Sequence, residues 1–211
     1  SVACGIKTDG TAWCWGSDAN GQLGNGASVT GSKSTPTQVD DPGPWVSISV
    51  SDNHACGIKA DGSLWCWGND TNGILGNGWT VTADQVSPYR VVGEGPWLKV
   101  SVSNSTSCAL KADTTIWCWG LNNQGQLADG TSTTRDAPTA IKAHSGWVDL
   151  GNSIYGGCAL HFDGSLWCWG RDVEGELGNG AFTTSYQDTP TRVSNWLSPW
   201  AWEWDDGGTN I

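Results

Sequence analysis

The stretch Cys56-Gly57-Ile58-Lys59-Ala60-Asp61-Gly62-Ser63-Leu64-Trp65-Cys66-Trp67-Gly68 is the clearest copy of a motif that recurs four times. Its Trp-Cys-Trp-Gly core begins at Trp13, Trp65, Trp117 and Trp167. A unit of about 50 residues cannot bury its apolar face alone, so such units stack or close into a ring. We therefore predict one domain over residues 1–211. Its repeats are expected at approximately 1–44, 45–96, 97–146 and 147–199, with a closing strand at 200–211.

The charge balance excludes several classes of partner. Lys and Arg total 10 against 21 Asp and Glu, a net charge of −11. Such a surface repels phosphate backbones and anionic lipid headgroups. No apolar stretch approaches the ~20 residues of a membrane span. We expect no nucleic acid, no membrane insertion, no metal and no cofactor.

The eight cysteines form four pairs, each separated by nine residues: Cys4 with Cys14, Cys56 with Cys66, Cys108 with Cys118, and Cys158 with Cys168. Each pair flanks an Asp-Gly turn or its variant. A two-residue turn would place Cys4 opposite Trp15, whereas a three-residue turn with Gly10 in the left-handed conformation places it opposite Cys14. Only the second register brings the thiols together. We predict four disulfides within hairpins, made outside the reducing cytosol.

The same register predicts the packing across each hairpin. It places Trp13 opposite Gly5 and Trp65 opposite Gly57, so that a large ring covers a small residue. The third copy has Thr114 where the others have glycine. That turn is expected to be strained or differently shaped.

Two further strands complete each repeat. Trp45 to Val50 alternates in polarity ahead of the hairpin, and a short strand led by Pro36 follows the glycine-rich loop 16–26. Four short strands per repeat are typical of a propeller blade. The fold class is therefore all-β, a propeller of four four-stranded blades.

The loop pattern Gly-x4-Gly-Gln-Leu-Gly-x-Gly at 16–26, after this hairpin, resembles the RCC1 (regulator of chromosome condensation) repeat family. The resemblance covers essentially the whole chain and implies a β-propeller. Family members act as exchange factors for a small GTPase, as a plant ultraviolet photoreceptor and as secreted inhibitors of β-lactamase. What they share is protein binding, not a chemistry. Their propellers usually have seven blades, and this chain holds four.

The first repeat lacks its leading strand, and the end of the chain supplies a candidate. Trp45 lies nine positions after Pro36, and the residue nine positions after Pro190 is Pro199. Trp200, Trp202 and Trp204 then take the expected buried places of Val46, Ile48 and Val50. We predict a circularly permuted propeller in which this strand completes the first blade. It does so within its own chain, which we favour, or in the next molecule of a filament.

Five aromatic residues break the repeat and are candidates for partner binding: Trp79, Tyr89, Tyr155, Phe182 and Tyr186. Local packing is the commoner explanation for any one of them.

The Asp18 and Asp70 loops faintly resemble calcium sites, but turn formation by the side chain explains them better. His54, His144 and His161 stand at three different repeat positions and form no nucleophile-base motif.

Two sequons, at Asn69 and Asn104, are candidate glycosylation sites.

These features together predict a secreted or cell-surface protein that is not an enzyme. Its expected role is that of a disulfide-stabilised scaffold or inhibitor module that binds a protein. The alternatives are a structural subunit that forms extracellular filaments by strand donation, and lectin-like binding of glycans.

Overall fold

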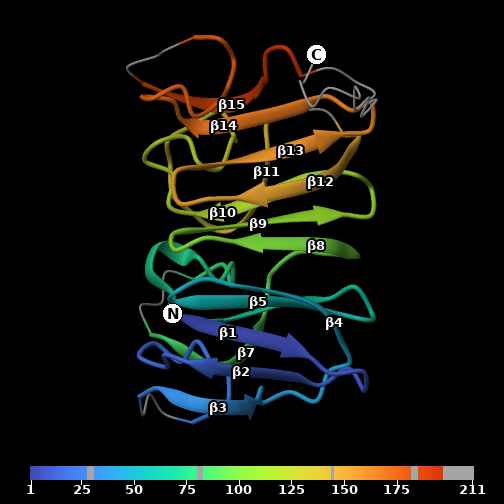
Figure 1. Cartoon of the computed structure of the whole chain (residues 1–211), viewed down its shortest axis with the longest axis vertical. Helices are drawn as coiled ribbons and strands as arrows, with labels where there is room; N and C mark the ends of the chain where they lie inside the picture. Colours follow the sequence, from blue (N-terminus) through green and yellow to red (C-terminus); the bar gives the residue numbers. More distant parts are fainter. Residues whose placement is uncertain (28–30, 80–82, 144, 182–184, 197–211) are drawn as a thin grey trace, which may run out of the picture.

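A computed structural model of the chain describes residues 1–27, 31–79, 83–143, 145–181 and 185–196. These residues form four antiparallel sheets, one per repeat, which follow one another along the long axis of the molecule (Figure 1). We call the sheets blades one to four. No helix in the described ranges is long and apolar enough to cross a membrane.

The strands of each blade pair in chain order. Blade one contains β1 (Val2–Ile6), β2 (Ala12–Gly16) and β3 (Lys33–Gln38). Blade two contains β4 (Trp45–Val50), β5 (His54–Lys59), β6 (Leu64–Gly68) and β7 (Gln85–Arg90), with a 3-10 turn at Thr71–Gly73. Blade three contains β8 (Trp97–Val102), β9 (Thr106–Lys111), β10 (Ile116–Gly120) and β11 (Arg135–Ala140). Blade four contains β12 (Trp147–Asn152), β13 (Gly156–His161), β14 (Leu166–Arg171) and β15 (Tyr186–Arg192).

The hairpins have the predicted register, in which Cys4 lies opposite Cys14. The turn forms because Asp9 Oδ1 accepts hydrogen bonds from the backbone N and the Oγ1 of Thr11, at 2.9 and 2.7 Å. Gly10 closes it at φ +84°. The aspartate and glycine of the motif thus fix which cysteines meet.

Each blade holds one of the four predicted disulfides across its hairpin, with Cα–Cα distances of 4.0 to 4.1 Å. The bonds join Cys4 with Cys14, Cys56 with Cys66, Cys108 with Cys118, and Cys158 with Cys168. Cys118 in β10 and Cys168 in β14 are buried, as are Cys14 and Cys66 at the same strand position. The sulfur atoms of these four cysteines therefore pack inside the blades, whereas Cys4 and Cys158 are half-buried.

Thr114 adopts the same left-handed conformation as the turn glycines, at φ +66°, so the expected strain is present and the shape is unchanged. A change in the following linker accommodates it. A Cβ on Gly62 would lie 2.7 Å from Pro96 Cβ. In the next blade the proline position is Gly146, whose backbone N donates to Thr114 Oγ1 at 2.9 Å. In the first pair the turn residue is glycine and the linker residue has the side chain, whereas in the second pair the turn residue has the side chain and the linker residue is glycine.

Two packing predictions were wrong. Val46 is 60% exposed and Trp45 is buried, because a bulge between Trp45 and Ser47 shifts the alternation of the leading strand. Residues that take the Val46 position therefore do not take a buried place. The ring that contacts Gly57 belongs to Trp45, whose Cε3 lies 2.8 Å from a Cβ built there, although Trp65 is the paired residue. Gly5 has no atom within 4 Å of such a Cβ.

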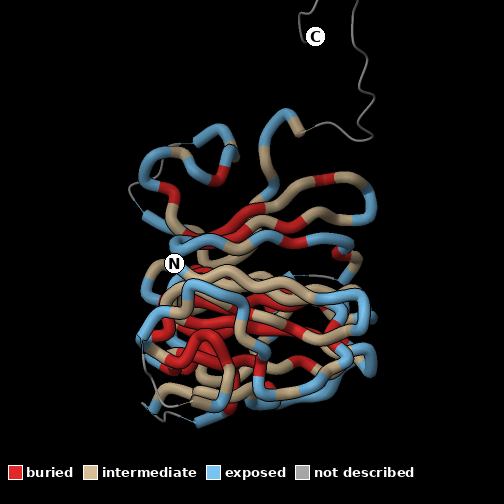
Figure 2. Tube along the Cα trace, turned by 60° about the horizontal axis from the view of Figure 1, so that its bottom comes forward, coloured by how far each residue is buried: buried red, intermediate tan, exposed pale blue. Residues whose placement is uncertain are grey.

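The core lies between neighbouring blades. β1 packs on β4, β5 on β8 and β9 on β12, while the leading strand β8 also contacts the leading strands β4 and β12. Buried residues run through the interior of the body, and exposed ones gather at the turns (Figure 2). Blade one has three strands within the described residues. The predicted closing strand with Trp200, Trp202 and Trp204 lies outside them, as do Phe182 and His144.

Candidate functional site

A tryptophan joins each blade to the one before it. Trp67, Trp119 and Trp169 donate from Nε1 to the backbone oxygens of Gln22, Ile74 and Gln126, at 3.0, 2.9 and 2.9 Å. All three indoles are buried. We call the loop that receives the ring the indole seat. A Cβ on Gly24 or Gly76 would lie 2.5 or 2.6 Å from the indole nitrogen, so glycine lets the ring approach closely.

A buried Asx residue shapes each seat. Asp18 Oδ1 accepts from Leu23 N at 3.1 Å, Asn122 Oδ1 does so from Leu127 N at 3.0 Å, and Asp172 Oδ1 from Leu177 N at 3.2 Å. Desolvation raises the pKa of Asp18 above its ordinary value. The side chains thus take part in turn formation, as predicted, through bonds that reach five residues along the loop. No group of three or more His, Cys, Asp or Glu residues within the described ranges is arranged to hold a metal.

Three further side chains join blade two to blade three. His54 Nε2 lies 2.9 Å from Ser107 Oγ, which itself donates to Ile74 O at 2.8 Å. Ser49 Oγ accepts from Val102 N at 3.1 Å. Complete burial lowers the pKa of His54 to about 3, because the protonated ring would lose its hydration. The imidazole is therefore neutral and serves as a packing and hydrogen-bonding group.

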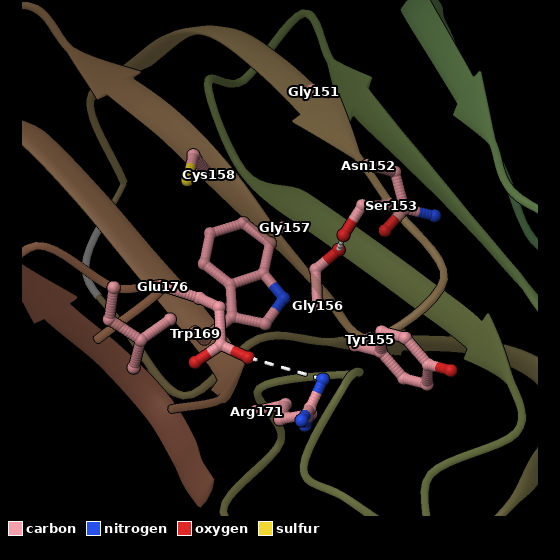
Figure 3. A pocket seen from close by; sticks show the side chains of 11 residues that line it. Gly151, Asn152, Ser153, Tyr155, Gly156, Gly157, Cys158, Trp169, Arg171 and Glu176 are labelled. Atoms are coloured by element: carbon pink, nitrogen blue, oxygen red, sulfur yellow. Dashed lines mark hydrogen bonds and ion pairs between the residues drawn. The ribbon is translucent and has the colours of Figure 1, made fainter. Parts of the chain in front are cut away.

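Blade four lacks the corresponding side chains. Gly156 takes the strand position of His54 and Gly151 that of Ser49. No tryptophan within the described residues occupies the seat at Leu177, and a Cβ on Gly178 would meet only Val193, at 3.2 Å. The result is a hollow of about 380 Å³. Its lining includes Gly151, Tyr155, Gly156, Trp169, Glu176 and Leu177 (Figure 3).

One cation and one ring mark the rim of this hollow. Arg171 lies 5.2 Å from the centre of the Tyr155 ring. Its guanidinium also pairs with Glu176 at 3.3 Å (Figure 3) and with Glu174 at 3.7 Å. An apolar floor with a few polar groups at its edge is typical of a recognition site. The described residues that line the hollow do not pair a nucleophile with a base.

The aromatic residues singled out in the sequence do not form one surface. Tyr155 lies at the hollow. Trp79, 61% exposed, and Tyr89 belong to blade two, and Tyr186 packs beside Gly125 in the loop of blade three. Within the described ranges no ring contact joins them, so their roles in binding stay predictions.

Both sequon amides already have partners. Asn69 Nδ2 donates to Asp84 Oδ1 at 3.1 Å, and Asn104 Nδ2 donates to Asp52 Oδ2 at 3.2 Å in the neighbouring blade. Glycosylation of either residue stays a prediction.

Two features of blade four were not predicted from the sequence. The first is the hollow, which Gly151 and Gly156 could have indicated because they break the repeat. The second is Phe162, which is 72% exposed.

Four antiparallel sheets that follow one another, each packed on the leading strand of the next, define a β-propeller fold. Models of the Regulator of chromosome condensation (RCC1) repeat match residues 9–58 and 61–110, and a second model of that repeat matches 45–74 and 97–126. The chain belongs to the RCC1 repeat family.

Similar proteins agree with this assignment. The human Regulator of chromosome condensation is 31% identical over 124 residues, which are 58% of this chain and 29% of that protein. The human E3 ubiquitin-protein ligase HERC2 is 26% identical over 145 residues, 67% of this chain and 3% of that protein.

Among solved structures, human WBSCR16 superposes with a TM-score of 0.78 at 22% identity, covering 92% of this chain and 52% of the other. Prp20p from Saccharomyces cerevisiae, characterised for its binding to Gsp1p and histones, gives 0.80 at 17% identity, with 92% and 48% covered. The chain thus spans about half of these propellers and less than a third of the curated relatives above.

Proposed function

We propose that this chain is a secreted, non-enzymatic protein-interaction module that acts as a scaffold or inhibitor, and that it binds its partner at the hollow on blade four. The observation that carries the proposal is the seat at Leu177, which has the form of three seats that each hold an indole. Four disulfides support a location outside the reducing cytosol.

The partner that fits is a protein that presents a tryptophan or another bulky aromatic side chain. The seat offers the Glu176 backbone oxygen at the position where the other seats accept an indole N–H. Gly151 and Gly156 leave more room than the joint of blade two has, because Ser49 and His54, which fill these positions there, are missing. Buried aromatic anchors of this kind carry much of the energy of protein interfaces.

The test uses N-acetyl-tryptophanamide as a probe in a nuclear magnetic resonance titration. We expect saturable shifts of the Trp169 indole N–H and of the Gly156 and Gly157 amides. Gly151→Arg should abolish them, since a Cβ at Gly151 meets no atom within 4 Å and the arginine is free to fill the hollow. Gly5→Arg, at an equally open glycine of blade one, is the matched control. Shifts that persist in Gly151→Arg would refute the proposal.

A second copy of the chain is the alternative partner, and one residue favours it. Trp15 takes the strand position of Trp67 and Trp169, yet it is only half-buried whereas they are fully buried. Blade one of one molecule on blade four of the next gives a head-to-tail contact. Repetition of this contact would produce a filament, which the sequence predicts as an alternative. The molecules would then be joined by packing of blade one on blade four, in addition to any donated strand.

Light scattering separates these partners. Self-association predicts masses above 22.3 kDa that rise with concentration. Trp15→Ala and Gly151→Arg should each reduce the protein to a monomer, whereas an equal mixture of the two variants restores one contact and gives a dimer. A monomer at every concentration would exclude the second copy and leave the first proposal to the titration. The exposed aromatics lie on different blades, so we do not extend the proposal to glycans.

A further inference from the structure

A lysine lies between two tryptophans in blades two and three. Lys59 Nζ lies 5.1 Å from the Trp45 ring centre and 4.2 Å from that of Trp65. Lys111 Nζ lies 4.7 Å from Trp97 and 4.0 Å from Trp117. The first ring comes from the leading strand and the second from the hairpin. Each ammonium group therefore lies within the range of cation–π attraction to two rings, and that of Lys59 also pairs with Asp41 Oδ2 at 2.7 Å.

Blade four keeps both rings and loses the lysine. Trp147 and Trp167 stand 6.4 Å apart with their planes at 87°, and the strand position of Lys59 and Lys111 is His161. The shorter imidazole reaches the edge of Trp147, with ring centres 5.4 Å apart. Its Nδ1 lies 3.0 Å from Asp163 Oδ1, and its Nε2 lies 3.4 Å from Ser145 O.

A cavity of about 380 Å³ lies beside these rings. Its walls include Trp147, Trp167, His161, Asp163, Lys142 and Pro190. Lys142 is exposed, and its stem lies against Gly130, where a Cβ would be 2.7 Å from Cδ and 3.3 Å from Nζ. The end of the Lys142 side chain thus packs on Gly130 while the residue also forms part of the cavity wall.

We propose that this cavity binds an alkylammonium group, such as the lysine side chain of a partner protein or a free quaternary amine, in the place that Lys59 and Lys111 fill in the other blades. This site is separate from the hollow at Leu177 and does not depend on the function proposed above. The two indole faces attract the cation, and Asp163 supplies a negative charge beside them. The net charge of −11 also favours cationic ligands over anionic ones.

The hydrogen bonds of the turn keep Asp163 ionised. Asp163 Oδ1 accepts from Ser165 Oγ at 2.6 Å and from Ser165 N at 2.8 Å. These bonds, with a smaller contribution from His161, hold the pKa of Asp163 well below its ordinary value. The carboxylate is thus charged at any pH at which an alkylammonium ion would be tested.

The first experiment titrates the protein with n-butylammonium chloride at pH 8, in a buffer free of Tris and ammonium. The readout is the indole N–H resonances of Trp147 and Trp167. We expect saturable shifts with one site per chain and a dissociation constant on the order of 1–10 mM, as befits two cation–π contacts. The neutral isostere 1-butanol should bind at least tenfold more weakly. Equal binding of 1-butanol, or no saturation, would overturn the proposal.

Variants that exchange lysine and histidine at this strand position between blades provide the sharper test. His161→Lys should fill the cavity with its own ammonium group and weaken n-butylammonium binding at least tenfold. Lys111→His should empty the corresponding place in blade three and give two sites per chain. Trp167→Ala should abolish binding in blade four. If His161→Lys binds as tightly as the native protein, the site is not the one proposed.

The two sources of the ligand are distinguished by a second pair of probes. Tetramethylammonium chloride represents a free quaternary amine, and N-acetyl-lysine-methylamide represents a lysine side chain within a protein. Tighter binding of either identifies the source, and binding of both with equal strength assigns the site to the ammonium charge alone. Failure of both probes in the native protein would refute an alkylammonium site.

Discussion

The joint between blades two and three and the face of blade four that bears the hollow share one backbone plan and differ in a few side chains. In the joint, His54, Ser49 and Trp119 reach across and make hydrogen bonds to the neighbouring blade. On blade four the positions of the first two are Gly156 and Gly151, and a hollow takes their place. Single side chains at the boundary thus add hydrogen bonds to the apolar packing between blades, and blade four forms a complete four-stranded sheet without them.

The largest test of this contrast is the loss of a joining indole. Trp119→Ala removes a buried ring and its hydrogen bond to Ile74, and should lower the free energy of unfolding by about 3–5 kcal/mol. Trp15→Ala removes the matching ring from blade one, where it is half-buried, and should cost under about 1 kcal/mol. Urea unfolding followed by circular dichroism measures both. Equal losses would show that the joints do not hold the blades together.

The next test uses the pH dependence of the same joint. His54 has an ordinary pKa of 6.5 and a native pKa of about 3, so the unfolded chain binds a proton that the native protein excludes. Its contribution is complete above pH 6.5 and is lost as the pH falls toward 3, by up to about 1.4 kcal/mol per pH unit.

His54→Thr supplies the control, because threonine is the residue at the same place in blade three. The stability of the native protein relative to this variant should fall by about 3 kcal/mol between pH 6.5 and pH 4. Carboxylates common to both proteins cancel in that difference. A difference that stays constant with pH would mean that His54 is protonated in the native joint.

The smallest test concerns the turn that contacts the following linker. Gly62→Thr places a side chain at φ +77° against Pro96 and should cost about 1–2 kcal/mol. Adding Pro96→Gly reproduces the pair found at Thr114 and Gly146. The double variant should recover about 1 kcal/mol relative to the sum of the single changes. Strict additivity in urea unfolding would show that the exchange of partners is coincidental.

The repeat allowed much of the fold to be predicted, because hairpin register depends on residues close together in the chain. The opposition of Cys4 and Cys14 followed from the Asp-Gly turn together with the pairing of the cysteines, and the same register holds for Cys118 and Cys168 with their partners. The exposure of Val46 did not follow, since a bulge at the start of the strand shifts the alternation and no residue type there announces it.

The joints were hidden for a different reason. The group that receives each indole is a backbone oxygen, so its residue can be Gln22, Ile74 or Gln126 without loss of the bond. The residue that accepts the indole N–H is therefore not marked by a constant side chain. The two candidate sites of blade four did leave a signal, in Gly156 and His161, which stand where the other repeats have larger or charged residues.

The four hairpin disulfides also set how far the molecule can be stretched. Each joins cysteines ten positions apart whose Cα atoms lie about 4 Å from one another. A fully extended segment of that length would span about 33–36 Å. Under a pulling force applied to the ends, every blade therefore withholds about 30 Å of chain until its disulfide is reduced. A reducing agent would lengthen the unravelled protein in four equal increments, one for each blade.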